Sequence, residues 1–257
     1  MNKILVIGDS CEDVFTYGHC KRLSPEAPVP VLNPISTKTN YGMATNVFNN
    51  IVALDGIGDI PTISCDLYTN KDKPIKTRYI EKESNQTLLR VDEHDEIQFI
   101  DVDILMKTRF MEYDAVVISD YNKGYLSEDM IALVSNRHPL VFMDSKKKLD
   151  SWCKNVSVIK INEKEYFENS DWLENYRGKL IITLGSRGTK FEDVIYPIQE
   201  QHPVRDLTGA GDTYLAALVV EYLRTEDIRK SIQFANKCAA WVVTQKGVTV
   251  VDLNKMK

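Results

Sequence analysis

Residues 206–214 carry the residue types that are best placed to do chemistry. They read Asp-Leu-Thr-Gly-Ala-Gly-Asp-Thr-Tyr and run directly into an apolar stretch. Gly209 and Gly211 lack Cβ, so the backbone can turn tightly and aim several N–H groups at one point, to which a starting helix adds its dipole. Asp212 at the mouth of this anion hole could take a proton from an alcohol, which predicts phosphoryl transfer to a hydroxyl. A capped helix start has the same composition and remains the alternative.

The same segment resembles the C-terminal signature of the ribokinase-like (PfkB) carbohydrate kinases. The resemblance implies that Asp212 is the catalytic base and that Gly209, Ala210 and Gly211 supply the anion hole. It also implies the fold of that family, an α/β three-layer sandwich with a predominantly parallel sheet and a small β lid. ATP and Mg²⁺ are the implied cofactors.

Length and composition indicate an ordinary globular protein. The chain has 257 residues, 43% hydrophobic and 27% charged, with a net charge of −5. The negative charge argues against nucleic acid as a partner, and no apolar run reaches the roughly 18 residues of a membrane span. The N-terminus begins as a strand and not as a secretion signal, and the five scattered cysteines have no zinc-site spacing. We therefore expect a cytoplasmic protein with reduced thiols and no membrane contact.

The elements that must position the catalytic segment alternate along the chain. Short apolar runs at 4–7, 115–119, 140–144, 156–161 and 180–184 predict buried parallel strands. Helical periodicity follows at 41–54, 128–137 and 227–245. This alternation predicts a mainly parallel sheet with helices on both faces, whose ligands lie at the carboxyl ends of the strands.

The expected sugar site begins at the end of the first strand. Asp9 ends that strand and Asp13 follows four residues later, although Asp13 could equally be a solvated turn residue. Residues 41–46 resemble the family pattern Gly-Gly-x-Ala-x-Asn, in which the glycine and asparagine contact sugar hydroxyls. The resemblance assigns those contacts to Gly42 and Asn46, with Tyr41 in place of the first glycine. An exposed helix residue is the alternative for Asn46.

Two β-prone stretches interrupt the alternation. Residues 12–38 contain short pieces broken by prolines, which restrict strands to edges or small separate sheets, and residues 76–92 read as a hairpin. Both resemble the two parts of the family lid, and residues 22–31 resemble the heptose-7-phosphate kinase branch. Because lids of this family commonly dimerise, we expect a homodimer through the lid. Residues 55–75 are shorter than is usual in the family.

Basic residues at matching positions suggest that the acceptor carries a phosphate. Arg90 lies in the Gln-x-Leu-x-Arg pattern of the lid, and Lys123 in Ser-Asp-Tyr-Asn-Lys-Gly, both typical of the heptose kinase branch. Lys146 follows Asp-Ser where the branch has Asp-Pro, and Arg22 belongs to the lid. We expect these cations to converge on one pocket, although each could instead be a solvated surface residue.

The nucleotide side rests on weaker patterns. Asn162 and Glu165 match the family motif Asn-x-x-Glu, which organises Mg²⁺ and its waters near the phosphates. Mg²⁺ keeps several waters and needs few protein ligands, so this pair suffices. Five further positions match residues that contact ATP in relatives: Thr183, Gly185, Gly188, Asn236 and Gly247. The resemblance implies that Asn236 lies beside the adenine.

The combined expectation is an ATP-dependent sugar kinase formed by one domain, residues 1–257, with lid segments at about 12–38 and 76–92. Transfer of the γ-phosphate to O1 of heptose 7-phosphate would give a heptose 1,7-bisphosphate. A kinase for an uncharged sugar or nucleoside, and a non-catalytic sugar- or nucleotide-binding protein, are the alternatives. The bifunctional members of the branch carry a nucleotidyltransferase with an H-x-G-H motif, which His19, His94, His138 and His202 do not form.

Overall fold

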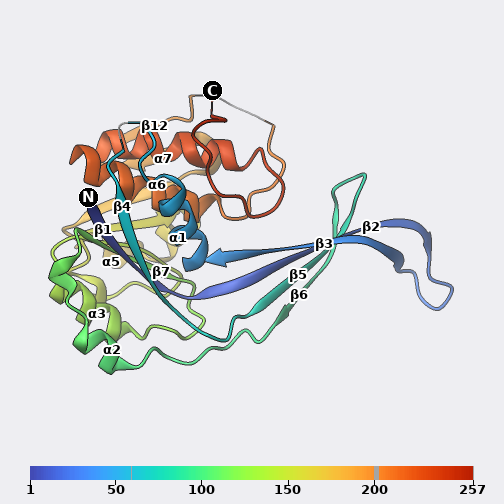
Figure 1. Ribbon diagram of the computed structural model, residues 1–257, viewed down its shortest axis with the longest axis horizontal. Helices are drawn as coiled ribbons and strands as arrows, with labels where there is room; N and C mark the ends of the chain where they lie inside the picture. Colours follow the sequence, from blue (N-terminus) through green and yellow to red (C-terminus); the bar gives the residue numbers. More distant parts are fainter. Residues whose placement is uncertain (59, 200–202, 257) are drawn as a thin grey trace.

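The computed structural model describes residues 1–58, 60–199 and 203–256, so His202 and the last residue of the expected domain lie outside the described part. Two sheets organise this chain (Figure 1). The larger one has the strand order β12-β11-β10-β9-β8-β7-β1-β4. Its strands from β4 to β10 pair in parallel, and β11 and β12 continue it as an antiparallel edge. The expected α/β fold with a mainly parallel sheet is confirmed.

The strands of the large sheet follow the predicted apolar runs closely. They are β1 (Asn2–Gly8), β4 (Ile63–Thr69), β7 (Ala115–Asp120), β8 (Val141–Ser145), β9 (Val158–Asn162), β10 (Lys179–Thr183), β11 (Thr189–Phe191) and β12 (Val194–Tyr196). The shortened stretch between the lid segments still supplies the edge strand β4, which pairs with β1 over its whole length. The sequence analysis assigned no strand to β4, β11 or β12. The edge strands β4 and β12 lack the continuous apolar pattern of buried ones, and β11 has only 3 residues.

Helices cover both faces of the large sheet (Figure 1). One core lies under α1 (Ala44–Ala53), α6 (Ala210–Thr225) and α7 (Ile228–Val242), and the other under α2 (Val102–Lys107) and α3 (Glu128–Arg137). Short helical turns complete the chain: α4 (Glu163–Glu168), α5 (Ser170–Leu173), η1 (Phe110–Glu112), η2 (Ser151–Cys153) and η3 (Gly185–Arg187). None of the helices in the described ranges combines the length and apolar character that crossing a bilayer would require.

The smaller sheet has the strand order β3-β2-β5-β6 and projects from the body as a long arm (Figure 1). Its strands are β2 (Ser10–Leu23), β3 (Pro30–Met43), β5 (Ile75–Glu81) and β6 (Thr87–Glu93). We call it the lid sheet. The predicted short pieces are two continuous 14-residue strands, because β3 is an edge strand and tolerates Pro30 and Pro34. Next to Pro34 the register shifts by one residue, so that Ile35 of β3 lies opposite the step from Tyr17 to Gly18.

Candidate active site

Asp212 lies in the first turn of α6, at the end of the glycine loop. Gly209 precedes the helix with φ 81°, a left-handed conformation that glycine adopts without strain. A Cβ at Gly209 would lie 2.7 Å from Nδ2 of Asn46, so a larger residue would also collide with α1. The loop therefore brings the start of α6 and the side chain of Asn46 together, as the sequence motif requires.

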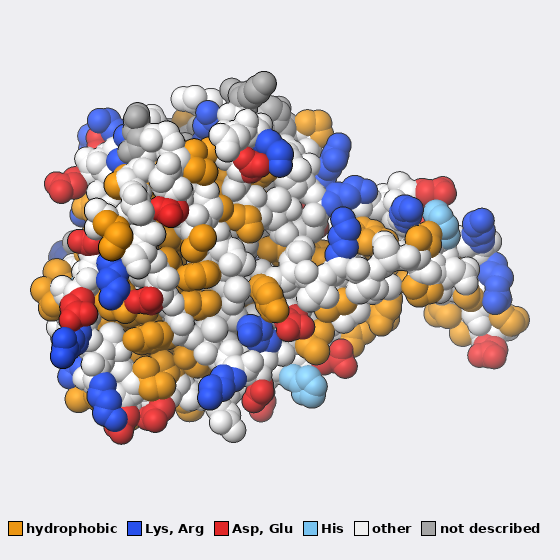
Figure 2. Space-filling model, viewed as in Figure 1, with side chains coloured by type: hydrophobic (Ala, Val, Ile, Leu, Met, Phe, Trp, Pro, Cys, Tyr) orange, Lys and Arg blue, Asp and Glu red, His pale blue; other side chains and the backbone are white. Residues whose placement is uncertain are grey.

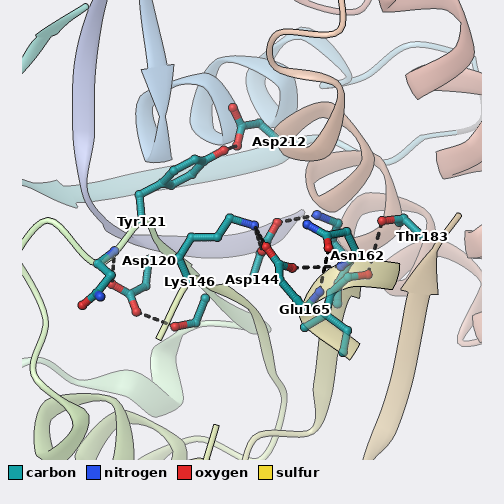
Figure 3. A network of polar contacts seen from close by, with 12 residues as sticks. Asp120, Tyr121, Asp144, Lys146, Asn162, Glu165, Thr183 and Asp212 are labelled. Atoms are coloured by element: carbon teal, nitrogen blue, oxygen red, sulfur yellow. Dashed lines mark hydrogen bonds and ion pairs between the residues drawn. The ribbon is translucent and has the colours of Figure 1, made fainter. Parts of the chain in front are cut away.

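The carboxylate of Asp212 is buried and held at both oxygens. Oδ1 accepts a hydrogen bond from the Tyr121 hydroxyl at 2.7 Å, which Figure 3 shows. Oδ2 accepts one from Nδ2 of Asn46 at 3.0 Å. Burial raises the pKa of Asp212 to about 6, although both hydrogen bonds favour the charged form. A base with a pKa near 6 is ionised at neutral pH and accepts a proton more readily than an ordinary aspartate.

The orientation of Asn46 is fixed by a second amide. Nδ2 of Asn50 donates to Oδ1 of Asn46 at 3.0 Å, so the amide nitrogen of Asn46 must face Asp212. Oδ1 of Asn50 in turn accepts from the hydroxyl of Thr213 and from the backbone N–H of Val251. Helices α1 and α6 thus share one buried polar chain that aims Asn46 at the candidate base.

Asp9 supports a loop instead of facing open space. Its fully buried carboxylate accepts the backbone N–H groups of Tyr121, Lys123 and Tyr125. Burial, followed by the charge of Asp120, raises the pKa of Asp9 despite these three hydrogen bonds. The sequence analysis placed Asp9 against the sugar, whereas in the structure its oxygens position the loop that carries Tyr121 and Lys123.

Asp13 and Gly42 meet where the lid sheet enters the body. Oδ1 of Asp13 accepts from Nη1 of Arg78 at 2.5 Å, and both side chains are largely buried. A Cβ at Gly42 would come within 2.2 Å of Oδ2 of Asp13, so glycine is needed for this approach. Arg78 was missed by the sequence analysis, since nothing within β5 indicates that its register places it near Asp13 across β2.

The four predicted phosphate-binding cations do not converge. Arg90 donates two hydrogen bonds to the carboxylate of Asp92, and Lys123 forms an ion pair with Asp95. Arg90 also interacts electrostatically with Asp95, and Lys123 with Asp92. These two cations therefore share one acidic neighbourhood. Lys146 is engaged by a different pair of carboxylates, Asp144 and Glu165, and Arg22 is exposed at the end of β2.

A cavity of about 560 Å³ opens on the other side of the glycine loop. Its lining includes Thr183, Gly185, Gly188, Ala210, Gly211 and Asn236. Most of the predicted nucleotide contacts thus line one space next to the start of α6. Asn236 also has a structural task there, since its amide bonds the hydroxyl of Thr189 and the carbonyl of Tyr196. Gly247 lies outside this lining, and its N–H donates to Asp206.

Asn162 and Glu165 form a helix cap. Each side chain accepts the backbone N–H of the other residue, at 2.9 Å in both cases, which makes a capping box at the start of α4. Glu165 also accepts from Nζ of Lys146 at 2.6 Å (Figure 3). Within the described part of the chain, no three His, Cys, Asp or Glu side chains are grouped as a metal site.

A buried lysine behind the anion hole was missed by the sequence analysis. Lys160 is 4% exposed and forms an ion pair with Asp144, and its Nζ lies 3.2 Å from the place where a Cβ of Gly211 would be. Burial pushes the pKa of Asp144 upward, but the charges of Lys160 and Lys146 outweigh it and hold this pKa below its usual value. The anion hole therefore has a positive charge beside its backbone amides. No local motif could have indicated it, because Lys160 lies in the middle of an apolar strand.

Comparison with known proteins identifies the family to which this chain is related. The sequence pattern of the pfkB family of carbohydrate kinases matches residues 62–255. The "Bifunctional protein HldE" of Helicobacter pylori (strain HPAG1) is 33% identical over 310 residues, and that of a Nitratiruptor species is 31% identical over 299 residues. These alignments cover 100% and 99% of this chain but only 66% and 64% of the relatives, so the chain spans about two thirds of their length.

Solved structures agree on the fold. Arabidopsis thaliana ribokinase, solved with ribose and ATP, superposes with a TM-score of 0.70 at 14% identity and covers 100% of this chain and 99% of its own. Phosphofructokinase-2 from Escherichia coli gives a TM-score of 0.75 at 13% identity, covering 100% and 97%. The three-layer ribokinase-like arrangement expected from the sequence is confirmed.

Proposed function

Since this chain belongs to the pfkB family of carbohydrate kinases, enzymes that transfer phosphate to an alcohol, we propose that its acceptor is a sugar phosphate. The specific proposal is transfer of the γ-phosphate of ATP to O1 of heptose 7-phosphate, which gives a heptose 1,7-bisphosphate. The observation that carries it is the place of Asp212, a buried carboxylate between the nucleotide-side cavity and the loop of Lys123. The choice of heptose is supported by the resemblance to the heptose-7-phosphate kinase branch and by the relatives named HldE, which are about 33% identical to this chain.

In the proposed mechanism Asp212 takes the proton of the acceptor hydroxyl as that oxygen attacks phosphorus. The N–H groups of Gly209, Ala210 and Gly211 hold the charge that develops on the transferred phosphoryl group, and Lys160 adds to the positive potential there. The lid sheet covers the sugar and excludes water, which limits hydrolysis of ATP. Asp13 and Asn46 lie at the junction of the lid sheet and the body, where they hold sugar hydroxyls.

Mg²⁺ fits the nucleotide end if it is held through water. Asn162 and Glu165 supply an amide oxygen and a carboxylate at the start of α4, where both also serve the helix cap, and Lys146 pairs with Glu165 in the free protein. A hydrated Mg²⁺ needs only such outer contacts with a carboxylate and an amide oxygen. When bound, the ion neutralises charge on the ATP phosphates. Lys146 would then be free to pair with the phosphates, so we assign it to ATP and not to the acceptor.

The decisive experiment is an ADP-release assay across a panel of acceptors. We expect turnover with heptose 7-phosphate, and much less with free heptose, ribose or a nucleoside. Preference for an uncharged sugar or nucleoside would replace the acceptor proposed above. ATP binding without turnover on any acceptor would instead indicate a non-catalytic nucleotide-binding protein.

The rate should depend on pH through Asp212. Its pKa is raised to about 6 by burial, so lowering the pH through that value protonates the base and removes activity. We expect kcat/KM for the acceptor to be constant above the pKa and to fall tenfold per pH unit well below it. Initial rates between about pH 4 and pH 8 with saturating ATP check this, and a rate that stays constant down to about pH 5 would exclude a base with a raised pKa.

We also propose that two chains pair through their lid sheets. The arm carries exposed apolar side chains, including Leu23 at 64% and Leu89 at 55% exposure (Figure 2). A narrow sheet with an exposed apolar face is marginally stable alone. Light scattering at micromolar concentration should give the mass of a dimer, and Leu89→Glu should give a monomer. Met111→Glu changes an even more exposed apolar residue on the body, at 73% exposure, and should leave the dimer intact. A monomeric unmodified chain would contradict this proposal.

We propose that residues 1–257 act as one kinase domain with the two lid segments inserted. Because the reaction consumes ATP, we place it in the cytoplasm. We assign neither a nucleic acid nor a membrane a role in this reaction.

A further inference from the structure

The Tyr121 hydroxyl is hydrogen-bonded to the Asp212 oxygen that would accept the proton in the reaction. It donates to Oδ1 of Asp212 at 2.7 Å, while Oδ2 is taken by Asn46. The carboxylate therefore has a hydrogen-bond donor on each oxygen before any acceptor has bound. An attacking alcohol must place its own O–H on one of these oxygens. Asn46 is locked by Asn50, so Oδ1 is the oxygen that can be made free.

Tyr121 is built so that its side chain can move while its backbone stays in place. Its N–H is held by Asp9 at 2.6 Å, which fixes the loop. Nζ of Lys146 and Nζ of Lys76 lie 5.7 Å and 5.8 Å from the centroid of its ring, so its aromatic face meets two lysine side chains. None of the ring–ring contacts among the described residues involves Tyr121. Rotation of the side chain alone would uncover Oδ1.

We propose that Tyr121 is a placeholder for the acceptor: its hydroxyl occupies Oδ1 of Asp212 in the free enzyme and is displaced by the acceptor hydroxyl. This inference rests on the proposed function. The hydroxyl keeps water away from the base while ATP is bound alone, and it reserves the position and direction from which the acceptor proton must come. Tyr121 is thus a positioning residue that acts through Asp212.

Tyrosine suits this task because it cannot compete as an acid. Burial, and then the charges of Asp212 and Asp144, hold the pKa of the Tyr121 hydroxyl well above its ordinary value, so it stays protonated and donates. Other ionisable groups near Asp212 are Asp144, Lys160 and Cys11. Of these, Asp144 and Lys160 are engaged with each other and the Cys11 thiol donates to Asp13, which leaves Tyr121 as the neutral donor on Oδ1.

The test is Tyr121→Phe, which removes the hydroxyl and keeps the ring. Because the acceptor then no longer competes with tyrosine, we expect KM for the acceptor to fall about tenfold with kcat within about threefold. ATP hydrolysis without acceptor should rise about tenfold, since water can reach Oδ1. Tyr113→Phe is the matched control, because Tyr113 also donates to a carboxylate, Asp66, at 2.7 Å, but outside the site. It should change neither quantity.

A second readout does not depend on turnover. Loss of a donor to the charged form should raise the pKa of Asp212 above about 6 in Tyr121→Phe. Titration of ¹³C-carboxyl-labelled aspartate by NMR, with Asp212→Asn to assign the signal, measures this. An unchanged pKa overturns the inference, as does a loss of kcat at unchanged acceptor KM, which would mean that Tyr121 takes part in the reaction itself. If the unaltered enzyme phosphorylates no sugar, the proposed function falls, and the placeholder role with it.

Discussion

Asp212→Asn should reduce kcat by about 10²–10⁴-fold while the affinity for ATP stays nearly unchanged. The amide has the size of the carboxylate but cannot take a proton from the acceptor. The nucleotide-side cavity is lined by Ala210 and Gly211 and not by the Asp212 side chain, so ATP binding does not require the charge. The largest effect therefore falls on chemistry and not on nucleotide binding.

Coupled ADP release measures the rate, and calorimetric titration with ATP measures the affinity. Asp171→Asn provides the matched control, because Asp171 is exposed in α5 and should keep full activity. A turnover of Asp212→Asn equal to that of the unaltered protein would mean that another group is the base. A loss of ATP binding in the same variant would mean that the substitution disturbed the glycine loop, and the rate would then have no bearing on proton transfer.

The catalytic loop was predictable from sequence because its chemistry is local. Glycine at a left-handed φ, a helix start and an aspartate in its first turn are adjacent in the chain, and the structure places them as the motif indicates. The buried strands and α3 were predictable for the same reason, since periodicity and a capping Ser127 act over a few residues. The lid strands were predicted only as fragments, because proline is a local signal and tolerance of it depends on edge position.

The parts that could not be predicted depend on pairs of distant residues. Tyr121 meets Asp212 across 91 positions, and Arg78 meets Asp13 across 65. Lys146 was placed on the acceptor phosphate because its local pattern matched that of relatives. In the free protein its side chain is instead engaged by the nearest carboxylates, Asp144 and Glu165. Ion-pair choice is decided by three-dimensional distance and burial, which a sequence pattern does not contain.

Lys123→Met should raise KM for heptose 7-phosphate by about one to two orders of magnitude and leave KM for ATP little changed. Lys123 lies on the loop that Asp9 holds, and this loop also carries Tyr121, so a sugar whose O1 lies at Asp212 extends its other end toward Lys123. In the free protein Asp95 pairs with Lys123, and a phosphate dianion carries more charge than this half-exposed carboxylate and should replace it. Charge-assisted contacts to phosphate contribute about 1.5–3 kcal/mol each, which corresponds to the expected change.

Steady-state kinetics with each substrate varied in turn check this expectation, and two further variants sharpen it. Lys146→Met removes the cation that pairs with Glu165, so it should raise KM for ATP and not for the acceptor. Lys154→Met removes an exposed lysine on the body and should change neither constant. Equal activity on heptose and heptose 7-phosphate would contradict a phosphate site at Lys123. A contact to the acceptor phosphate should raise the Michaelis constant of the acceptor and leave that of ATP unchanged. An effect of Lys123→Met on KM for ATP alone would therefore place this lysine on the nucleotide.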